Sequence, residues 1–253
     1  MDKNNFSTGS GVQENKKSRI RTIAAVLLVV GIFVCGYTWL LAPWLLNWGT
    51  TAEEAVRVLP GDTYVSGPTR VGMTQAITID TPPDKIWPWL VQMGQDRAGF
   101  YSYEKLERLF GFGIHNTYRI VPEWQNLEAG DFVKFHQWGI GMQVVSVEKD
   151  KNILMVTDSR TPMKDTPGKK ELRLPLPEGM YIVWDWDFNL ISLPDKKTRL
   201  VIRALAGWSD MNPVISWILQ FAVGFPSSIM QMQMLKELKQ CSEGTHPALA
   251  VNK

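Results

Sequence analysis

Cysteine and histidine are scarce in this chain, with two and three residues among 253. Cys35 lies in an apolar stretch and Cys241 near the C-terminus, so a disulfide between them is not expected. The sequence has no CxxC pair, no Cys/His spacing of a zinc site, no GxSxG motif and no glycine-rich phosphate loop. The formal net charge of +2 gives no field that would favour nucleic acid. We therefore expect no cofactor, no metal and no nucleic-acid partner.

Charged side chains are also absent from Ile23 to Leu46. A helix of this length, at about 1.5 Å per residue, crosses a bilayer core of about 30 Å. The stretch is longer than the apolar region of a cleavable signal peptide, which has about 7–15 residues. Trp39, Trp44 and Trp48 gather at its C-terminal end, as an aromatic belt does. The stretch is therefore predicted to be a single transmembrane helix in the plasma membrane.

The flanks of this stretch predict its orientation. Lys and Arg at positions 16, 17, 19 and 21 precede it, whereas Glu53 and Glu54 follow it. Because Lys and Arg gather on the cytoplasmic side of a span, we expect a cytoplasmic N-terminus and an extracytoplasmic body. The predicted organisation is a disordered cytoplasmic tail (1–22), a transmembrane helix (23–46), a linker (47–70), a folded domain (71–241) and a flexible C-terminal tail (242–253).

The body begins with a strand and two short helices and continues with strands. Val71–Ile79 alternates as a strand does, and Thr81 is predicted to cap a helix that opens with Pro82. A second short helix is predicted over Tyr103–Phe110. Six further strands are predicted near Tyr118–Pro122, Phe132–Gln137, Gly141–Glu148, Ile153–Asp158, Tyr181–Leu190 and Thr198–Ala206.

The alternation is clearest in Tyr181–Leu190, where apolar and polar side chains take opposite faces. The apolar face holds Ile182, Trp184, Trp186, Phe188 and Leu190, and the polar face holds Asp185, Asp187 and Asn189. A period of two indicates an antiparallel strand with one buried face. The two carboxylates are therefore expected on a solvated face, near Arg199 and Arg203 of the next strand, and not in acid–base chemistry.

The C-terminal part is predicted to be helical. Val214–Met230 is apolar enough to raise the question of a second span, but a polar or small residue recurs at every fourth position from Ser216 to Ser228. This pattern favours an amphipathic helix docked on the domain, which Pro226 would kink or split. Before it, a Pro-rich and basic loop is predicted over 160–179.

Several segments resemble one protein superfamily. The stretch from Thr81-Pro82-Pro83-Asp84 to Gln92-Met93-Gly94 is similar to the first-helix segment of the SRPBCC superfamily (START-like and polyketide cyclase/dehydrase proteins). Arg97–Tyr103, His115-Asn116, Arg119–Trp124 and Leu59-Pro60-Gly61-Asp62 after a single span resemble a bacterial membrane-anchored subgroup. The resemblance covers about residues 50–240.

This resemblance implies an α+β helix-grip fold, in which a curved antiparallel sheet of about seven strands surrounds a long C-terminal helix. It also implies an apolar cavity between sheet and helix. It implies no particular reaction, because the superfamily contains binders, transporters and enzymes without a shared catalytic motif.

Eleven Trp and eleven Met exceed what a core of this size needs, and some are expected to line that cavity. His115 and His136 are either hydrogen-bonded structural residues or polar groups at its mouth. The candidate ligand-binding residues are Trp89, Tyr101, Tyr103, His115, Trp124, His136, Trp186 and Met230. No catalytic constellation is recognised.

Besides an interaction domain with a closed core and no pocket, two functions remain open on this basis. The first is a membrane-anchored binding module that holds a lipid or another apolar small molecule. The second is a cyclase, dehydratase or hydrolase that acts on an apolar substrate in the same cavity. Polar groups with a perturbed pKa that converge inside the cavity would favour the enzyme. The oligomeric state is not predicted.

Overall fold

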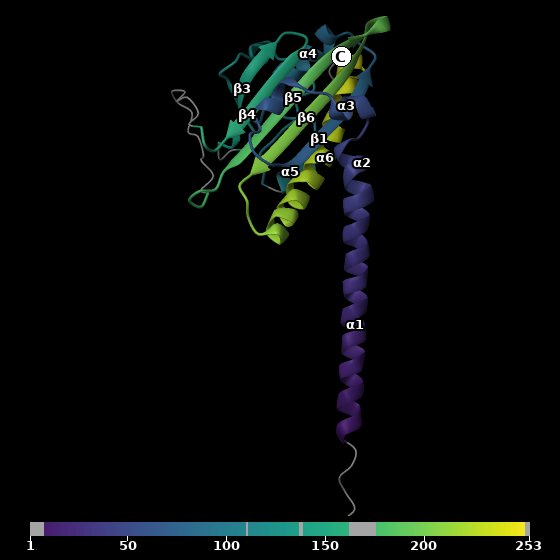
Figure 1. Ribbon diagram of the computed structural model, residues 1–253. Coiled ribbons are helices and arrows are strands. Elements are labelled where there is room, and N and C mark those ends of the chain that lie inside the picture. The colour runs from purple at the N-terminus through teal and green to yellow at the C-terminus, as the bar shows by residue number, and fades with distance from the viewer. Residues whose placement is uncertain (1–7, 110, 137–138, 162–175, 251–253) are drawn as a thin grey trace, which may run out of the picture. The chain divides into compact units, whose positions relative to one another are not determined.

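The computed structural model describes residues 8–109, 111–136, 139–161 and 176–250 (Figure 1). The chain divides into two compact units, Met1–Trp44 and Leu45–Lys253. We refer to them as unit 1 and unit 2 and describe each by itself.

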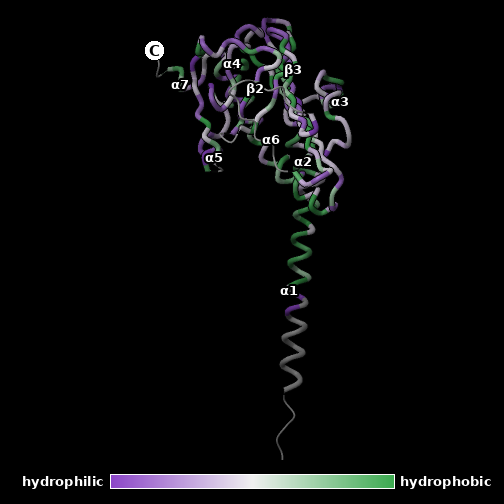
Figure 2. Tube along the Cα trace, turned by 90° about the vertical axis from the view of Figure 1, so that its left-hand side faces the viewer, coloured by the Kyte–Doolittle hydropathy of each residue, from purple (hydrophilic) through white to green (hydrophobic). Residues whose placement is uncertain are grey.

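Unit 1 is helical. α1 (Thr8–Gly36) continues into a π-helical turn, η1 (Tyr37–Leu41), and then into α2 (Ala42–Leu46). The stretch Arg21–Leu46 has a mean hydropathy of 2.4 and is long and apolar enough to cross a membrane. Figure 2 shows hydrophobic residues following one another along it. The predicted disordered tail is wrong from Thr8 onward, because good helix formers such as Glu14 and Lys16 extend a helix already nucleated; residues 1–7 lie outside the described part.

Unit 2 is an antiparallel sheet of six strands in the order β1-β6-β5-β4-β3-β2. Consecutive strands pair with one another from β2 to β6, and β1 closes the order beside β6. The strands are β1 (Thr69–Ile79), β2 (Phe132–Lys134), β3 (Gly141–Glu148), β4 (Asn152–Asp158), β5 (Ile182–Leu193) and β6 (Lys197–Trp208).

One face of the curved sheet packs against two helices, α4 (Pro83–Val91) and the long α6 (Pro213–Glu243) (Figure 1). Met234, Leu235 and Leu238 of α6 are buried in the same core as Phe188 of β5 and Ile202 of β6. A sheet that holds a long C-terminal helix in this way is the helix-grip arrangement, so the predicted α+β fold class is confirmed.

The opposite face of the sheet is covered by the segment that follows α2. This segment contains α3 (Ala52–Val56) and the 3-10 turn η2 (Pro60–Thr63). The Gly61 N–H donates to Asp187 Oδ2 at 2.9 Å. A Cβ at position 61 would lie 2.7 Å from Asp185 Oδ2, so only glycine allows this close approach. The residues predicted as a linker therefore form a layer of the fold.

The polar face of β5 is consequently buried. Asp185 and Asp187 are fully buried, which corrects the prediction of a solvated face. Arg203 lies opposite Asp187 in the β5–β6 register but forms its ion pair with Asp62 of η2, and Arg199 pairs with Glu54 of α3. The covering segment, whose contacts join residues 126 to 145 positions apart in the chain, decides these pairings.

The predicted strand at Tyr118–Pro122 is absent, and the segment ends in the 3-10 turn η3 (Pro122–Trp124). The Gln92 side chain takes the place of a neighbouring strand: its Oε1 accepts from the Val121 N–H and its Nε2 donates to the Arg119 carbonyl. The amide of one side chain thus satisfies this backbone, and the sheet has six strands, not about seven, among the residues that the structure describes.

The helix boundaries bring smaller corrections. Pro82, not Thr81, is the N-cap of α4. α5 is Glu104–Leu109, and Phe110, the predicted end of this helix, lies outside the described residues. Gln137, the predicted end of β2, also lies outside them. Most of the predicted loop 160–179 also lies outside them. α6 is a single helix with Pro226 inside it.

The C-terminal residues are packed on the domain. α6 continues to Glu243, and α7 (Pro247–Ala250) follows a left-handed Gly244 cap. Leu249 packs against the main core, and the His246 ring stacks on Tyr118 with centroids 4.0 Å apart. The prediction of a flexible tail from residue 242 is therefore wrong as far as Ala250, because this short helix finds an apolar and aromatic surface to cover.

Candidate functional site

An aromatic cluster lies on the sheet face that α6 covers, with Trp186 at its centre. The period of two along β5 places Trp184, Trp186 and Phe188 on this face. The Trp186 ring is 4.8 Å from Phe188, 5.5 Å from Phe135 and 5.9 Å from Phe100 between centroids. Phe100 and Phe188 are buried, whereas Phe135, Trp184 and Trp186 remain partly exposed. Aromatic surface on this face is thus accessible.

Gln231 of α6 brings a polar group to this cluster. The Trp186 Nε1–H donates to Gln231 Oε1 at 2.9 Å, and Gln231 Nε2 donates to the Ile202 carbonyl at 3.4 Å. Gln231 is buried, and its neighbour Met230, a predicted site residue, is half-buried. The Gln231 side-chain amide therefore holds the Trp186 ring against α6. Together they form an apolar wall that carries one polar group.

A second polar centre surrounds Tyr101. Gln92 Nε2 donates to the Tyr101 hydroxyl at 2.7 Å, and Asn116 Oδ1 accepts from the Tyr101 N–H at 2.9 Å. Tyr101 has a φ of 54°, a left-handed conformation that the Asn116 contact supports. The predicted residue Trp89 packs edge-on against it at 5.9 Å. Burial raises the pKa of the Tyr101 hydroxyl, which therefore acts as a neutral hydrogen-bonding group.

Ser102 and Glu107 lie next to this centre and were not predicted. Ser102 Oγ donates to the Met230 carbonyl at 3.3 Å, which ties the segment to α6. Glu107 of α5 is 1 % exposed, and Ser102 is its polar neighbour. Burial, with a smaller effect of the Glu104 charge, raises the pKa of Glu107 to about 7. This carboxyl group is partly protonated near neutral pH.

The predicted residues His136 and Trp124 are placed differently from each other. His136 is buried, its ring meets Phe112 edge-on at 4.9 Å, and its backbone N–H donates to the Ile140 carbonyl. Trp124 is half-buried against the core, and its carbonyl accepts from Arg97 Nη2 at 2.8 Å. Both side chains pack as structural residues do.

Tyr103 and His115 lie on the surface and do not join the cluster. The Tyr103 side chain is 41 % exposed, and the His115 side chain is 71 % exposed and 3.2 Å from Glu104. Tyr103 immediately precedes α5 and His115 follows it, and most side chains of α5 are exposed. The sequence pattern, which gave both residues as candidate ligand-binding residues, contains no signal for these positions.

A metal centre would need several ligand side chains close together. Among the residues that the structure describes, no group of three or more His, Cys, Asp or Glu side chains is arranged to hold a metal ion.

The residues that sequence reasoning missed are Gln92, Gln231 and Glu107. A polar side chain inside an otherwise apolar helical pattern was the available signal for Gln231.

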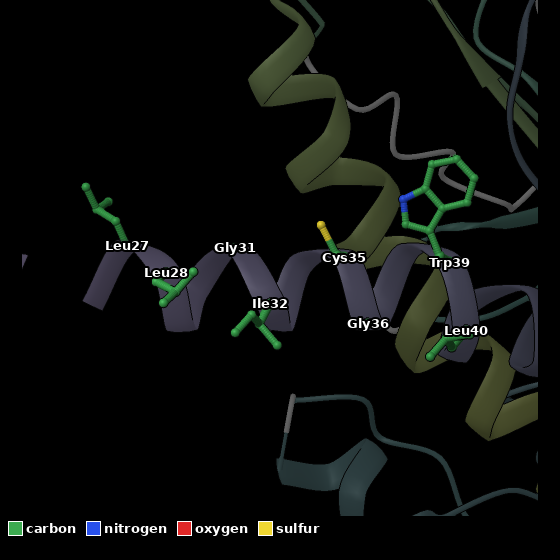
Figure 3. A pocket seen from close by; sticks show the side chains of 8 residues that line it. All are labelled: Leu27, Leu28, Gly31, Ile32, Cys35, Gly36, Trp39 and Leu40. Atoms are coloured by element: carbon green, nitrogen blue, oxygen red, sulfur yellow. The ribbon is translucent and has the colours of Figure 1, made fainter. Parts of the chain in front are cut away.

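A separate hollow of about 690 Å³ lies on unit 1 alone (Figure 3). All of its lining residues belong to one helical stretch, from Leu27 to Leu40. Gly31 and Gly36, which have no side chain, leave space on this part of the helix surface. Such a hollow on one apolar helix is an open groove, not an enclosed ligand site. In a bilayer it would be filled by acyl chains.

No protein-family model matches the sequence, and no curated protein matches it. Solved structures are similar at low identity. A protein from Mesorhizobium loti, MLL2253, is 17 % identical over 70 % of this chain and 99 % of its own, with a TM-score of 0.36. KanY is 12 % identical over 69 % and 98 %, with a TM-score of 0.39. CalU16 from Micromonospora echinospora is 12 % identical over 77 % and 92 %, with a TM-score of 0.32. At these values no ligand or activity is transferred, and the fold assignment rests on the sheet and helix of unit 2 themselves.

Proposed function

We propose that unit 2 binds an apolar small molecule or a lipid against the sheet face that α6 covers. We propose further that Ile23–Leu46 anchors the chain in the plasma membrane, with the N-terminus cytoplasmic and unit 2 outside. The observation that carries the binding proposal is the aromatic cluster around Trp186. Its rings pack on the core side of the sheet, yet three of them keep exposed surface.

Exposed aromatic surface of this kind favours an apolar ligand. Covering it gains about 25 cal/mol for each Å² of apolar area removed from water. Sites for small molecules combine mostly apolar walls with a few polar groups that orient the ligand. Here the walls are Phe135, Trp184 and Trp186, and the buried polar group is Gln231, whose Oε1 accepts from the Trp186 Nε1–H.

The test uses the full chain in lipid nanodiscs and a fatty acid that carries a photoreactive diazirine. After irradiation, labelled peptides are mapped by mass spectrometry. We expect labels on β5 around Trp186 and on α6 at residues 228–238, besides the background that lipid contact gives on α1. Labelling confined to α1 and to residues 213–221, with none around Trp186, would overturn the binding proposal.

A matched pair of variants makes the test specific. Trp186→Ala removes the central ring, so labelling of residues 228–238 should fall several-fold. Trp39→Ala removes a ring from the apolar stretch in unit 1, where the side chain is 78 % exposed, and should leave that labelling unchanged. Circular dichroism of both variants checks that the fold persists.

Glu107 favours a second candidate, an enzyme that transfers a proton to or from an apolar substrate. Its carboxyl group is buried, and its pKa of about 7 suits a general acid or base at neutral pH. Under this hypothesis Glu107→Gln abolishes turnover of a substrate identified by the labelling experiment but preserves its binding. Unchanged turnover in this variant would remove Glu107 from catalysis.

A further inference from the structure

The N-terminal half of α6 exposes an apolar surface that the fold does not use. Val214 is 65 % exposed and Ile218 is 51 % exposed, and Ile215, Trp217 and Leu219 are also exposed. Figure 1 shows these first turns of α6 extending beyond the sheet. We call Val214–Leu219 the apolar tip. A contiguous exposed apolar surface of this kind marks contact with a membrane or with a protein.

The composition around the apolar tip favours a membrane. No Asp, Glu, Lys or Arg occurs between Asp210 and Lys236. The rings of Trp217, Phe221 and Phe225 stack along the helix, with centroids 6.2 Å and 5.5 Å apart. Trp is enriched at the boundary between water and bilayer, and an apolar helical face without charges partitions there.

A complete crossing by α6 does not fit the fold. Pro213–Ala250 is apolar enough for a span by composition, with a mean hydropathy of 1.4. However, Gln231, Met234 and Leu238 are buried between the sheet and α4. The helix before Ser228 measures about 22 Å at 1.5 Å per residue, which is shorter than a bilayer core of about 30 Å. The apolar tip can therefore enter the interface but cannot cross the membrane.

The end of the apolar stretch lies beside the same helix. Leu46 packs in one cluster with Val71 of β1 and Val223 of α6, and its Cδ2 lies 3.8 Å from a Cβ placed on Gly224. Gln75 Nε2 donates to the Leu45 carbonyl at 2.7 Å and to the Ser228 carbonyl at 3.0 Å. The point where the stretch joins unit 2 is thus fixed to α6, about 6–14 Å along the helix from the apolar tip.

We propose that the apolar tip of α6 inserts into the bilayer interface, so that unit 2 touches the membrane through a second element besides the predicted span. This proposal rests on the proposed anchoring of Ile23–Leu46. Leu45 and Leu46, where this stretch ends, contact residues of unit 2 that neighbour or belong to α6. The contact would place the sheet and its aromatic cluster close to the lipid surface.

The test places an environment-sensitive dye at single cysteines of the full chain in nanodiscs. The background is Cys35→Ala, since Cys241 is buried and unreactive. The dye is attached at Ile218→Cys, at Trp39→Cys in the predicted span, and at Lys196→Cys on the exposed turn between β5 and β6. Spin-labelled lipids then quench only those dyes that touch acyl chains.

The expected result is blue-shifted emission at positions 218 and 39, most of it lost to the spin-labelled lipids, and no loss at position 196. Quenching at 39 without any at 218 would overturn the apolar-tip proposal while leaving the anchor intact. Absence of quenching at both would instead contradict the anchor. Blue-shifted, unquenched emission at 218 that depends on protein density would show a second copy of the chain on this surface and would also overturn the proposal.

Discussion

Asp185 is a buried carboxyl group whose negative charge is only partly compensated. Its Oδ1 accepts from the Leu205 N–H, whereas Oδ2 has no hydrogen-bond partner in the described part of the chain. Burial raises the pKa of Asp185 to about 7, and the charges of Asp187 and Asp62 act in the same direction. Asp187 has more partners, because Gly61, Asn152 and Asn189 all donate to it. The two neighbouring carboxyl groups therefore differ in how their charge is stabilised.

The raised pKa of Asp185 predicts how the free energy of unfolding depends on pH. The folded chain holds a proton on Asp185 up to about pH 7, whereas the unfolded chain releases it near a pKa of about 3.9. Between these values the folded state binds more protons, so the free energy of unfolding falls as the pH rises from about 4 to about 7. Glu107 acts in the same direction. Urea unfolding of the full chain in detergent at several pH values measures the slope.

Asp185→Asn is the variant that isolates this effect. The amide cannot ionise, so the fall in stability between about pH 4 and about pH 7 should become shallower. Asp195→Asn, on the exposed turn between β5 and β6, is the control and should keep the parent slope. An Asp185→Asn variant that keeps the parent slope would show that Asp185 is ionised in the folded state over this range.

At the scale of elements, the segment with α3 and η2 behaves as a strap across the sheet. Thr51 and Glu54 form a capping box that starts α3, and Glu54 also pairs with Arg199 of β6. Asp62 of η2 pairs with Arg203, whose side chain is 6 % exposed. Arg203 also donates to the Thr74 hydroxyl of β1 at 3.0 Å. The strap thus supplies acidic partners to two arginines of the sheet, Arg199 and Arg203, on the face that the strap covers.

Removing one partner of the inner pair should therefore be costly. Asp62→Ala leaves the Arg203 guanidinium buried with fewer acceptors and should destabilise the chain by about 2–3 kcal/mol, somewhat less than a fully buried pair because Asp62 is partly exposed. Glu128→Ala, at an exposed position with an ordinary backbone conformation, should cost less than about 0.5 kcal/mol. Chemical unfolding measures both. Similar costs for the two would show that the strap is not held by this pair.

At the scale of the whole molecule, the proposed topology follows from the charges around one apolar stretch. Arg19 and Arg21 precede the stretch and Glu53 and Glu54 follow it, and a mean hydropathy of 2.4 makes the stretch suitable for a bilayer. The strap begins at Thr51, only a few residues after Leu46. Unit 2 is therefore tethered by a short connection whose residues already belong to its fold.

Labelling of intact cells tests this topology. Lys196→Cys is exposed on a turn of unit 2 and should react with a thiol reagent that cannot cross membranes. Ser10→Cys, before the apolar stretch, should react only after the cells are opened. Both variants carry Cys35→Ala. Protection at position 196 together with reactivity at position 10 would reverse the proposed orientation.

The apolar stretch and the positions of most strands could be predicted from the residues alone, whereas the fold class was what the family resemblance implied. β3 has the predicted bounds, and the apolar face of β5 meets α6 through Trp186 as its period of two predicts. These features depend on local patterns, since hydrophobic periodicity and turn residues act within a few positions of the chain. The same patterns predict that β5 has one apolar and one polar face. They do not predict which segment covers each face.

The tertiary structure alone decided the burial of Asp185 and Asp187, the loss of the strand at Tyr118–Pro122 and the surface positions of Tyr103 and His115. Each depends on a group distant in sequence or on one backbone turn: Gly61 approaches β5 from the strap, and Gln92 replaces a strand as a hydrogen-bond partner. A buried polar group must find a partner wherever the fold supplies one. Sequence periodicity carries no information about such long-range partners, so only packing could assign these residues.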